Sequence, residues 1–160
     1  CIRDSYRADQ DLDQDLAVEL QGMFRRELGI TVQLTRQEWT VLLNSQSTLD
    51  YDFSRSTWLG DYNDPNTFLD MFVTGGGNNN TGWGLKKYDD LIAAAGREVD
   101  REKRFALFRE AEKMLVTEAS PICPLYYFVN VQFYDPDRIG GIEANLLDEH
   151  PIKAIYWKKR

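Results

Sequence analysis

The sequence predicts an α/β fold, in which short strands alternate with helices around one core. A helical pattern from Asp9 to Leu28 is followed almost at once by an alternating segment, Ile30 to Leu34. A second helical pattern, Gln37 to Gln46, precedes the alternating segment Tyr51 to Trp58. This order of elements is typical of a sheet flanked by helices, and 160 residues suffice for one compact domain.

The first helix is predicted from apolar residues that recur every three to four positions. We expect them to form one buried stripe, made of Leu12, Leu16, Leu20, Met23 or Phe24, and Leu28. An acidic run at the start places negative charge at the positive end of the helix dipole: Asp9, Asp11, Asp13 and Asp15. Gly29 is expected to cap the other end.

The next elements follow from the same two periodicities. In the segment Ile30 to Leu34, every second residue is apolar and lies on one strand face. The helix Gln37 to Gln46 is expected to bury Trp39, Leu42 and Leu43. The strand Tyr51 to Trp58 should place Tyr51 and Phe53 on one face.

Turn-forming residues then separate the two halves of the sequence. Gly60 to Asn66 is predicted to be a turn or loop, and Pro65 to open a short helix that carries Phe68, Leu69 and Phe72. The glycine- and asparagine-rich stretch Thr74 to Gly84 is expected to be an exposed loop. It lacks the lysine and hydroxyl of a phosphate-binding loop.

Two further helices are predicted in the second half. The helix Lys87 to Val99 should bury Tyr88, Leu91, Ile92 and Ala95, and the helix Arg101 to Glu118 should bury Phe105, Phe108, Ala111, Met114 and Leu115. After Pro121 comes a run of strand-forming residues, and Pro124 favours an edge strand there. The remainder, Arg138 to Arg160, is expected to be extended.

Composition excludes several classes of function. The net charge of −7 argues against nucleic acid or an anionic membrane as partner. No apolar run reaches the roughly 20 residues that a membrane span requires. Cys1, Cys123 and His150 form no set of ligands for zinc and no catalytic pair, so we expect no metal and no cofactor. A chain that starts at Cys1 is expected to be a processed product or a piece of a longer chain.

Candidate binding residues gather at the end of the third strand and in the loop behind it. Trp58 and Tyr62 are aromatic walls, Asp61 can hold an ammonium group, and Arg55 can hold a carboxylate. Together these groups suit a zwitterionic ligand. In the simpler alternative Trp58 belongs to the core, Arg55 and Asp61 are surface charges, and Asp64 caps the helix that Pro65 starts.

Two enzymatic alternatives receive less support. Asp61 and Asp64 could be the paired carboxylates of a glycosidase, but the sequence does not give the distance between them. A nucleophilic triad is not indicated, since His150 lies in a polar run and no serine occupies a G-x-S-x-G turn.

Several strings, in this order and spacing, resemble the C-terminal part of the extracytoplasmic oligopeptide- and dipeptide-binding proteins of bacterial ABC importers, solute-binding protein family 5. They are L-Q-G-M-F-R-R-E-L-G-I-T-V (20–32), Q-E-W (37–39), Y-D-F-S-R-S-T-W-L-G-D-Y-N-D-P (51–65), Y-D-D-L-I (88–92), A-E-K-M-L (111–115) and P-L-Y-Y-F-V-N (124–130). The W-x-x-D-Y-x-x-P core is the most specific of them.

The resemblance implies a partial lobe of a periplasmic-binding-protein type II clamshell, with a mixed sheet flanked by helices. Residues 1–123 would form the incomplete C-terminal ligand-binding lobe, and residues 124–160 a return segment that crosses to the other lobe. At least one strand ahead of Asp9 would lie outside the sequence. The implied protein is not an enzyme. It is extracytoplasmic, in the periplasm or cell envelope, and binds a peptide for delivery to a membrane permease. An incomplete lobe could also self-associate.

The resemblance also implies roles for individual residues. Asp61 matches the aspartate that holds the α-ammonium of a peptide, with Trp58 beside it, while Leu59 would offer backbone groups to the ligand. Arg55 matches an arginine that can meet the carboxylate of a short peptide. One departure is the acidic run Asp9 to Asp15, where some relatives carry a basic residue. The family also contains binders of nickel chelates, sugars and opines, but Asp61 favours a free amine.

Overall fold

The structure is a computed structural model that describes residues 2–145 and 147–159, so Cys1 lies outside the described residues. The chain forms two compact units, which we describe separately. The first contains the residues up to Trp58 together with Met71–Lys86, and the second contains Leu59–Asp70 and the chain from Lys87 onward. Helices and short strands alternate as expected, and the predicted α/β class is confirmed.

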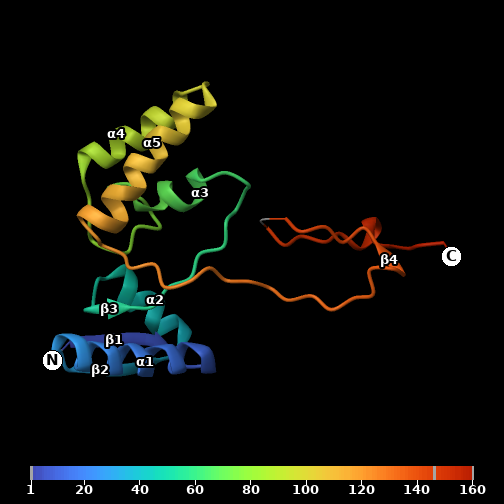
Figure 1. The fold of residues 1–160 in the computed structure, drawn as a ribbon. Coiled ribbons are helices and arrows are strands. Elements are labelled where there is room, and N and C mark those ends of the chain that lie inside the picture. The colour runs from blue at the N-terminus through green and yellow to red at the C-terminus, as the bar shows by residue number, and fades with distance from the viewer. Residues whose placement is uncertain (1, 146, 160) are drawn as a thin grey trace. The chain divides into compact units, whose positions relative to one another are not determined.

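The first unit is built on a parallel three-stranded sheet. Strands β1 (Ile2–Arg7), β2 (Val32–Gln37) and β3 (Phe53–Ser54) are ordered β2-β1-β3. Helix α1 (Asp11–Leu28) connects β1 to β2, and α2 (Trp39–Ser47) connects β2 to β3 (Figure 1). Among residues 2–145 and 147–159, antiparallel pairing is confined to a separate small sheet in the second unit.

Strand β1 lies ahead of Asp9 and was not predicted from the sequence. It is the central strand, and it escaped prediction because its buried positions carry polar atoms rather than an alternating apolar pattern. Asp4, Ser5 and Tyr6 are 7%, 1% and 6% exposed. Burial raises the pKa of the Asp4 carboxyl.

Helix α1 has the predicted cap but a narrower buried face. Gly29 adopts the left-handed conformation with φ 66° and donates to the carbonyl of Phe24. The face turned to the sheet is centred on Asp13 and Ala17, and Phe24 stacks on Phe53 of β3 at 5.3 Å between ring centroids. The expected stripe is wrong at two positions, because Leu12 and Leu28 are exposed, and of the alternatives Met23 and Phe24 it is Phe24 that turns inward.

Helix α2 begins at a side-chain cap and buries polar residues. The Glu38 carboxylate accepts from the backbone N–H groups of Thr40 and Val41. Leu42 is buried as expected, but the prediction is wrong for Trp39 and Leu43, which are exposed. The inner positions are instead Ser45 and Gln46, because this face of α2 meets polar groups at the strand ends: Gln46 Nε2 donates to Ser54 Oγ at 2.8 Å.

The glycine- and asparagine-rich segment Thr74 to Gly84 is a loop, as predicted, but one that is tied together by a side chain. Asn79 Nδ2 donates to the carbonyls of Phe72, Val73 and Trp83 at 3.1, 3.1 and 2.9 Å. The Tyr51 hydroxyl also donates to the carbonyl of Asn80. These bonds fix the course of a segment whose composition alone gives little order.

The second unit contains the helices α3 (Asn66–Leu69), α4 (Lys86–Arg97) and α5 (Arg101–Lys113), the last extended by a π-helical turn, η2 (Met114–Glu118). A 3₁₀ turn, η1 (Asp70–Phe72), follows α3. Helices α4 and α5 lie side by side (Figure 1). The predicted inward residues of both helices are confirmed as buried, except Phe105, which is half-buried: Tyr88, Leu91, Ile92, Ala95, Phe108, Ala111, Met114 and Leu115.

The strand predicted after Pro121 is not formed. Among the described residues no strand pairs with this stretch, and Tyr127 and Phe133 are each 94% exposed. Strand-forming residues alone do not make a strand, because the backbone groups need a paired neighbour. Further on, β4 (Ile139–Gly140) pairs antiparallel with β5 (Tyr156–Trp157), and a 3₁₀ turn, η3 (Ile152–Ala154), precedes β5.

Candidate functional site

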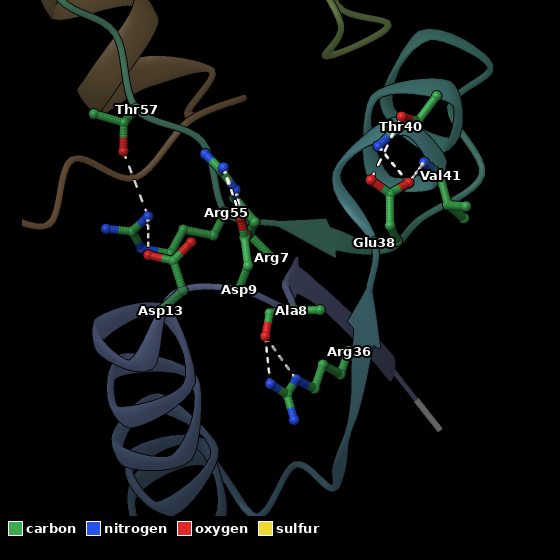
Figure 2. Close-up of polar contacts among 10 residues, drawn as sticks. All are labelled: Arg7, Ala8, Asp9, Asp13, Arg36, Glu38, Thr40, Val41, Arg55 and Thr57. Carbon is green, nitrogen blue, oxygen red and sulfur yellow. Dashed lines mark hydrogen bonds and ion pairs between the residues drawn. The ribbon is translucent and has the colours of Figure 1, made fainter.

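The carboxyl ends of β1 and β3 form the first part of the candidate site. The chain leaves β1 toward α1 and β2 on one side, while β3 pairs on the other side of β1. Ligands of open α/β sheets bind outside strand ends at such a reversal of strand order. Figure 2 shows that charged side chains gather there, from the segments that follow β1, β2 and β3.

Arg55 and Asp13 form a buried ion pair at this edge. Arg55 Nη1 lies 2.5 Å from Asp13 Oδ1, and the two side chains are 15% and 5% exposed (Figure 2). The backbone of Arg55 is held on both sides, because its N–H donates to the carbonyl of Ser5 and its carbonyl accepts from Gln46 Nε2. The predicted carboxylate-binding arginine is therefore fixed in place and already paired with a carboxylate of its own chain.

A second ion pair lies nearby but faces solvent. Arg7 Nε and Nη2 donate to the two carboxylate oxygens of Asp9 at 2.6 and 2.8 Å, and the Asp9 side chain is 59% exposed. Hydrogen bonding from Arg7 holds the pKa of Asp9 below its ordinary value. The same guanidinium lies 4.5 Å above the ring of Trp39, which explains how an exposed tryptophan is accommodated.

Asp61 lies in the second unit, on a loop of fixed conformation. Its N–H donates to the hydroxyl of Thr67 at 3.0 Å, and Thr67 is 2% exposed. Gly60 leaves little room for a side chain just before it, because a Cβ atom there would stand 3.0 Å from the Phe68 ring. The Asp61 residue is exposed, and among the described residues of its own unit no group donates to its carboxylate. Its backbone conformation is fixed, and its carboxylate can accept hydrogen bonds from a ligand.

Tyr62 is held by a small polar network on α3. Its hydroxyl donates to Asp70 Oδ2 at 3.3 Å, and Asn66 Nδ2 donates to both the Tyr62 hydroxyl and Asp70, at 2.9 and 2.7 Å. The residue is 42% exposed. The network fixes the orientation of the Tyr62 ring, and Tyr62 directly follows Asp61 in the sequence.

Asp64 has a structural role. Its carboxylate accepts two hydrogen bonds from the Arg104 guanidinium, at 2.5 and 2.8 Å, and one from the N–H of Asn66 at 2.9 Å. The expectation that Asp64 caps the helix is confirmed. Arg104 holds the pKa of Asp64 below its ordinary value, which is opposite to the raised pKa that a glycosidase acid requires.

Trp58 and Leu59 occupy the link between the two units. Trp58 is half-buried, and its indole N–H is buried without an acceptor among the described residues. Leu59 is 71% exposed, so its side chain adds little to the core.

Other chemistry finds little support among the described residues. They contain no group of three or more histidine, cysteine, aspartate or glutamate side chains arranged to hold a metal ion. His150 Nε2 lies 2.8 Å from Asp148, beside no serine or cysteine nucleophile in the described contacts. Over the same residues, no helix combines the length and apolarity that a membrane crossing needs.

Asp13 is the site residue that the sequence analysis missed. It was interpreted as one of several acids at a helix start, whereas it is the counter-ion of Arg55. The only local indication was its position one helical turn before Ala17, which places both residues on the same, buried face of α1. Its partner Arg55 follows β2, α2 and β3 in the chain, and no rule of sequence spacing connects the two residues.

Comparison with known proteins places this arrangement in one family. Residues 2–80 match the model described as bacterial extracellular solute-binding proteins, family 5 Middle. The dipeptide-binding protein DppE of Bacillus subtilis is 41% identical over 140 residues, which are 88% of this chain and 24% of DppE. The chain spans about a quarter of the length of the curated relatives it matches.

Solved structures agree over almost the whole chain. The unliganded open form of MppA, a periplasmic murein tripeptide-binding protein, superposes with a TM-score of 0.87 at 30% identity and covers 99% of this chain and 30% of its own. The Haemophilus influenzae OppA complex with the peptide RPPGFSPFR gives a TM-score of 0.82 at 25% identity, with 99% and 31% covered. The relatives are named as binding proteins, several of them as periplasmic ones.

Proposed function

Because this chain belongs to the bacterial extracellular solute-binding proteins of family 5, we propose that the complete protein is the peptide-binding component of an ABC importer. Outside the cytoplasm, it holds an extended peptide between two lobes and delivers the peptide to a membrane permease. Residues 1–123 contribute part of one lobe, and residues 124–160 return toward the other. The role is binding without covalent chemistry.

The observation that carries this proposal is the unfilled carboxylate of Asp61 on its fixed loop. The Thr67 bond and the tight fit at Gly60 hold the backbone, so little conformational freedom is lost when a ligand binds. A carboxylate in this state accepts charge-assisted hydrogen bonds from the α-ammonium of a peptide. Trp58 and Tyr62 flank the ammonium, and Leu59 pairs its backbone with the peptide.

The nearby carboxylates are less suited to this task. Asp64 accepts from Arg104 and Asn66, and Asp70 accepts from Asn66 and Tyr62. Each is thus committed to a neighbour within the second unit. Asp61 is the residue of the loop whose charge remains for a cation from outside.

The test combines one substitution with one change of ligand. Asp61→Asn keeps the size of the side chain and removes its charge, so peptide affinity should fall about ten- to hundredfold, as for a lost hydrogen bond to a charged group. N-acetylation of the peptide should cause a similar loss in the wild type. Calorimetry on the complete gene product measures both.

The combination is the decisive part of this test. If Asp61 holds the α-ammonium, acetylation should have little further effect on the Asp61→Asn variant, because the two changes remove the same interaction. Additive losses would place the ammonium elsewhere. Asp11→Asn, which removes an exposed charge from the first unit, is the matched control and should bind as the wild type does.

A further inference from the structure

Arg55 is a cation at the candidate ligand site, but its charge is already paired with the Asp13 carboxylate of the same chain. The guanidinium stands at the carboxyl end of β3, where the fold places ligands, and contacts Asp13 at 2.5 Å (Figure 2). Because the Asp13 side chain is only 5% exposed, water screens this pair far less than it screens Arg7 and Asp9. An incoming group therefore meets an arginine whose charge is already opposed by a carboxylate of its own chain.

We propose that Asp13 is a specificity-determining residue: as the built-in counter-ion of Arg55, it takes the position that a ligand carboxylate would occupy. This rests on the proposed function. The protein then gains no affinity from a free C-terminus and binds peptide acids and peptide amides alike. Its affinity comes from the amino terminus and the peptide backbone.

A ligand carboxylate cannot readily replace Asp13. Asp13 is attached to the first turn of α1, where the helix dipole also favours a negative charge. Displacing it would leave a buried carboxylate without its partner, which is strongly unfavourable. A ligand that approached without displacing it would meet a like charge. Both outcomes disfavour selection for a free carboxylate.

The experiment compares peptide acids with the corresponding C-terminal amides. Alanine peptides of about two to five residues vary the distance between the amino terminus and the terminal carboxylate of the ligand. In the wild type, the two forms should bind within about threefold of each other. In Asp13→Asn, the acid of at least one length should bind about tenfold or more tighter than its amide, because the carboxylate that opposes Arg55 and would repel the ligand's own carboxylate has lost its charge. The double variant Asp13→Asn/Arg55→Gln should lose this preference.

Asp11→Asn is the matched control, because it removes a charge from the same first turn of α1 without releasing Arg55. It should leave the acid-to-amide ratio unchanged. A wild type that favours acids by more than about tenfold at any length overturns the proposal without any variant. So does an Asp13→Asn variant that binds peptides with the wild-type ratio.

A second measurement separates this proposal from the proposed function. If no alanine peptide binds the wild type or the variants, peptide binding through Asp61 fails, and acetate then serves as the probe of Arg55. Acetate should raise the melting temperature of Asp13→Asn, but neither that of the wild type nor that of the double variant. Equal shifts in all three would overturn the role of Asp13.

Discussion

Two aspartate–arginine pairs, one in each unit, use the same chemistry in different surroundings. The sheet-edge pair, Asp13–Arg55, is 5% and 15% exposed and joins a helix start to a strand end. The helix pair, Asp64–Arg104, is 26% and 25% exposed and joins the start of α3 to α5 through two hydrogen bonds. The helix pair lies within a packed group of helices, and the sheet-edge pair lies at the strand ends, the edge where open α/β sheets commonly bind ligands.

The difference shows that a charged pair must be judged by its position as well as its geometry. The helix pair has the better fork-to-fork geometry and the clearer structural role, because it also caps α3. The sheet-edge pair is more deeply buried, so its partners depend more strongly on each other. A buried pair at a strand end can determine which charges a ligand is allowed to carry.

The largest effect is expected from breaking the sheet-edge pair on its cationic side. Arg55→Gln leaves the buried Asp13 carboxylate without a counter-ion, and such a change lowers the free energy of unfolding by about 3 to 5 kcal/mol. Urea unfolding measures the loss. The double variant Asp13→Asn/Arg55→Gln should recover most of it, because no buried charge remains.

This prediction fails if Arg55→Gln unfolds at the wild-type urea concentration. That outcome would mean that water reaches Asp13 freely, and the contrast between the two pairs would disappear. Equal losses in the single and double variants would instead show that Arg55 stabilises the unit through packing alone.

An intermediate effect is expected in the second unit, at Tyr88. This side chain is fully buried, and its hydroxyl donates to the carbonyl of Leu69 at 2.6 Å. Tyr88→Phe keeps the ring and leaves that carbonyl without its donor, which should cost about 1 to 3 kcal/mol of unfolding free energy. Urea unfolding measures it, with Tyr127→Phe at a 94% exposed position as control. A loss in the control as large as that at Tyr88 would contradict the argument.

The helices of the second unit were predictable, because their signal is local. Tyr88, Leu91, Ile92 and Ala95 recur at helical spacing, and all four are buried. Each helix closes its own backbone hydrogen bonds, so the sequence of one segment nearly decides its structure.

The strands were less predictable, because a strand depends on distant partners. Strand β1 carries Asp4 and Ser5 at buried positions and was missed, while the apolar stretch after Pro121 forms no strand among the described residues. Pairing with β2 and β3 makes the first a strand, and no described segment pairs with the second. Local composition contains neither fact.

The candidate site shows the same division. Arg55, Trp58 and Asp61 were found because they stand close together in the sequence, around one strand end and loop. The pairing of Arg55 with Asp13 was not found, since only the folding of β1, α1 and β3 together brings the two side chains into contact. The roles of the site residues in ligand binding remain predictions.

The smallest effect is expected at the helix pair, where it can be recognised by its dependence on pH. Arg104 lowers the pKa of Asp64 below the ordinary 3.8, so the pair stabilises the folded state above that pH, and this contribution is lost as the pH falls through the lower folded pKa. Asp64→Asn should therefore lower the free energy of unfolding by about 1 kcal/mol near neutral pH, since solvent reaches a quarter of each side chain. The difference in unfolding free energy between the variant and the wild type should shrink below about pH 3.8.

Taking this difference removes the contribution of Asp4, whose pKa is raised by burial and whose effect on stability has the opposite sign. A loss that stays constant across the acidic range would contradict the argument, because it would show that the stability change does not depend on the charge of Asp64.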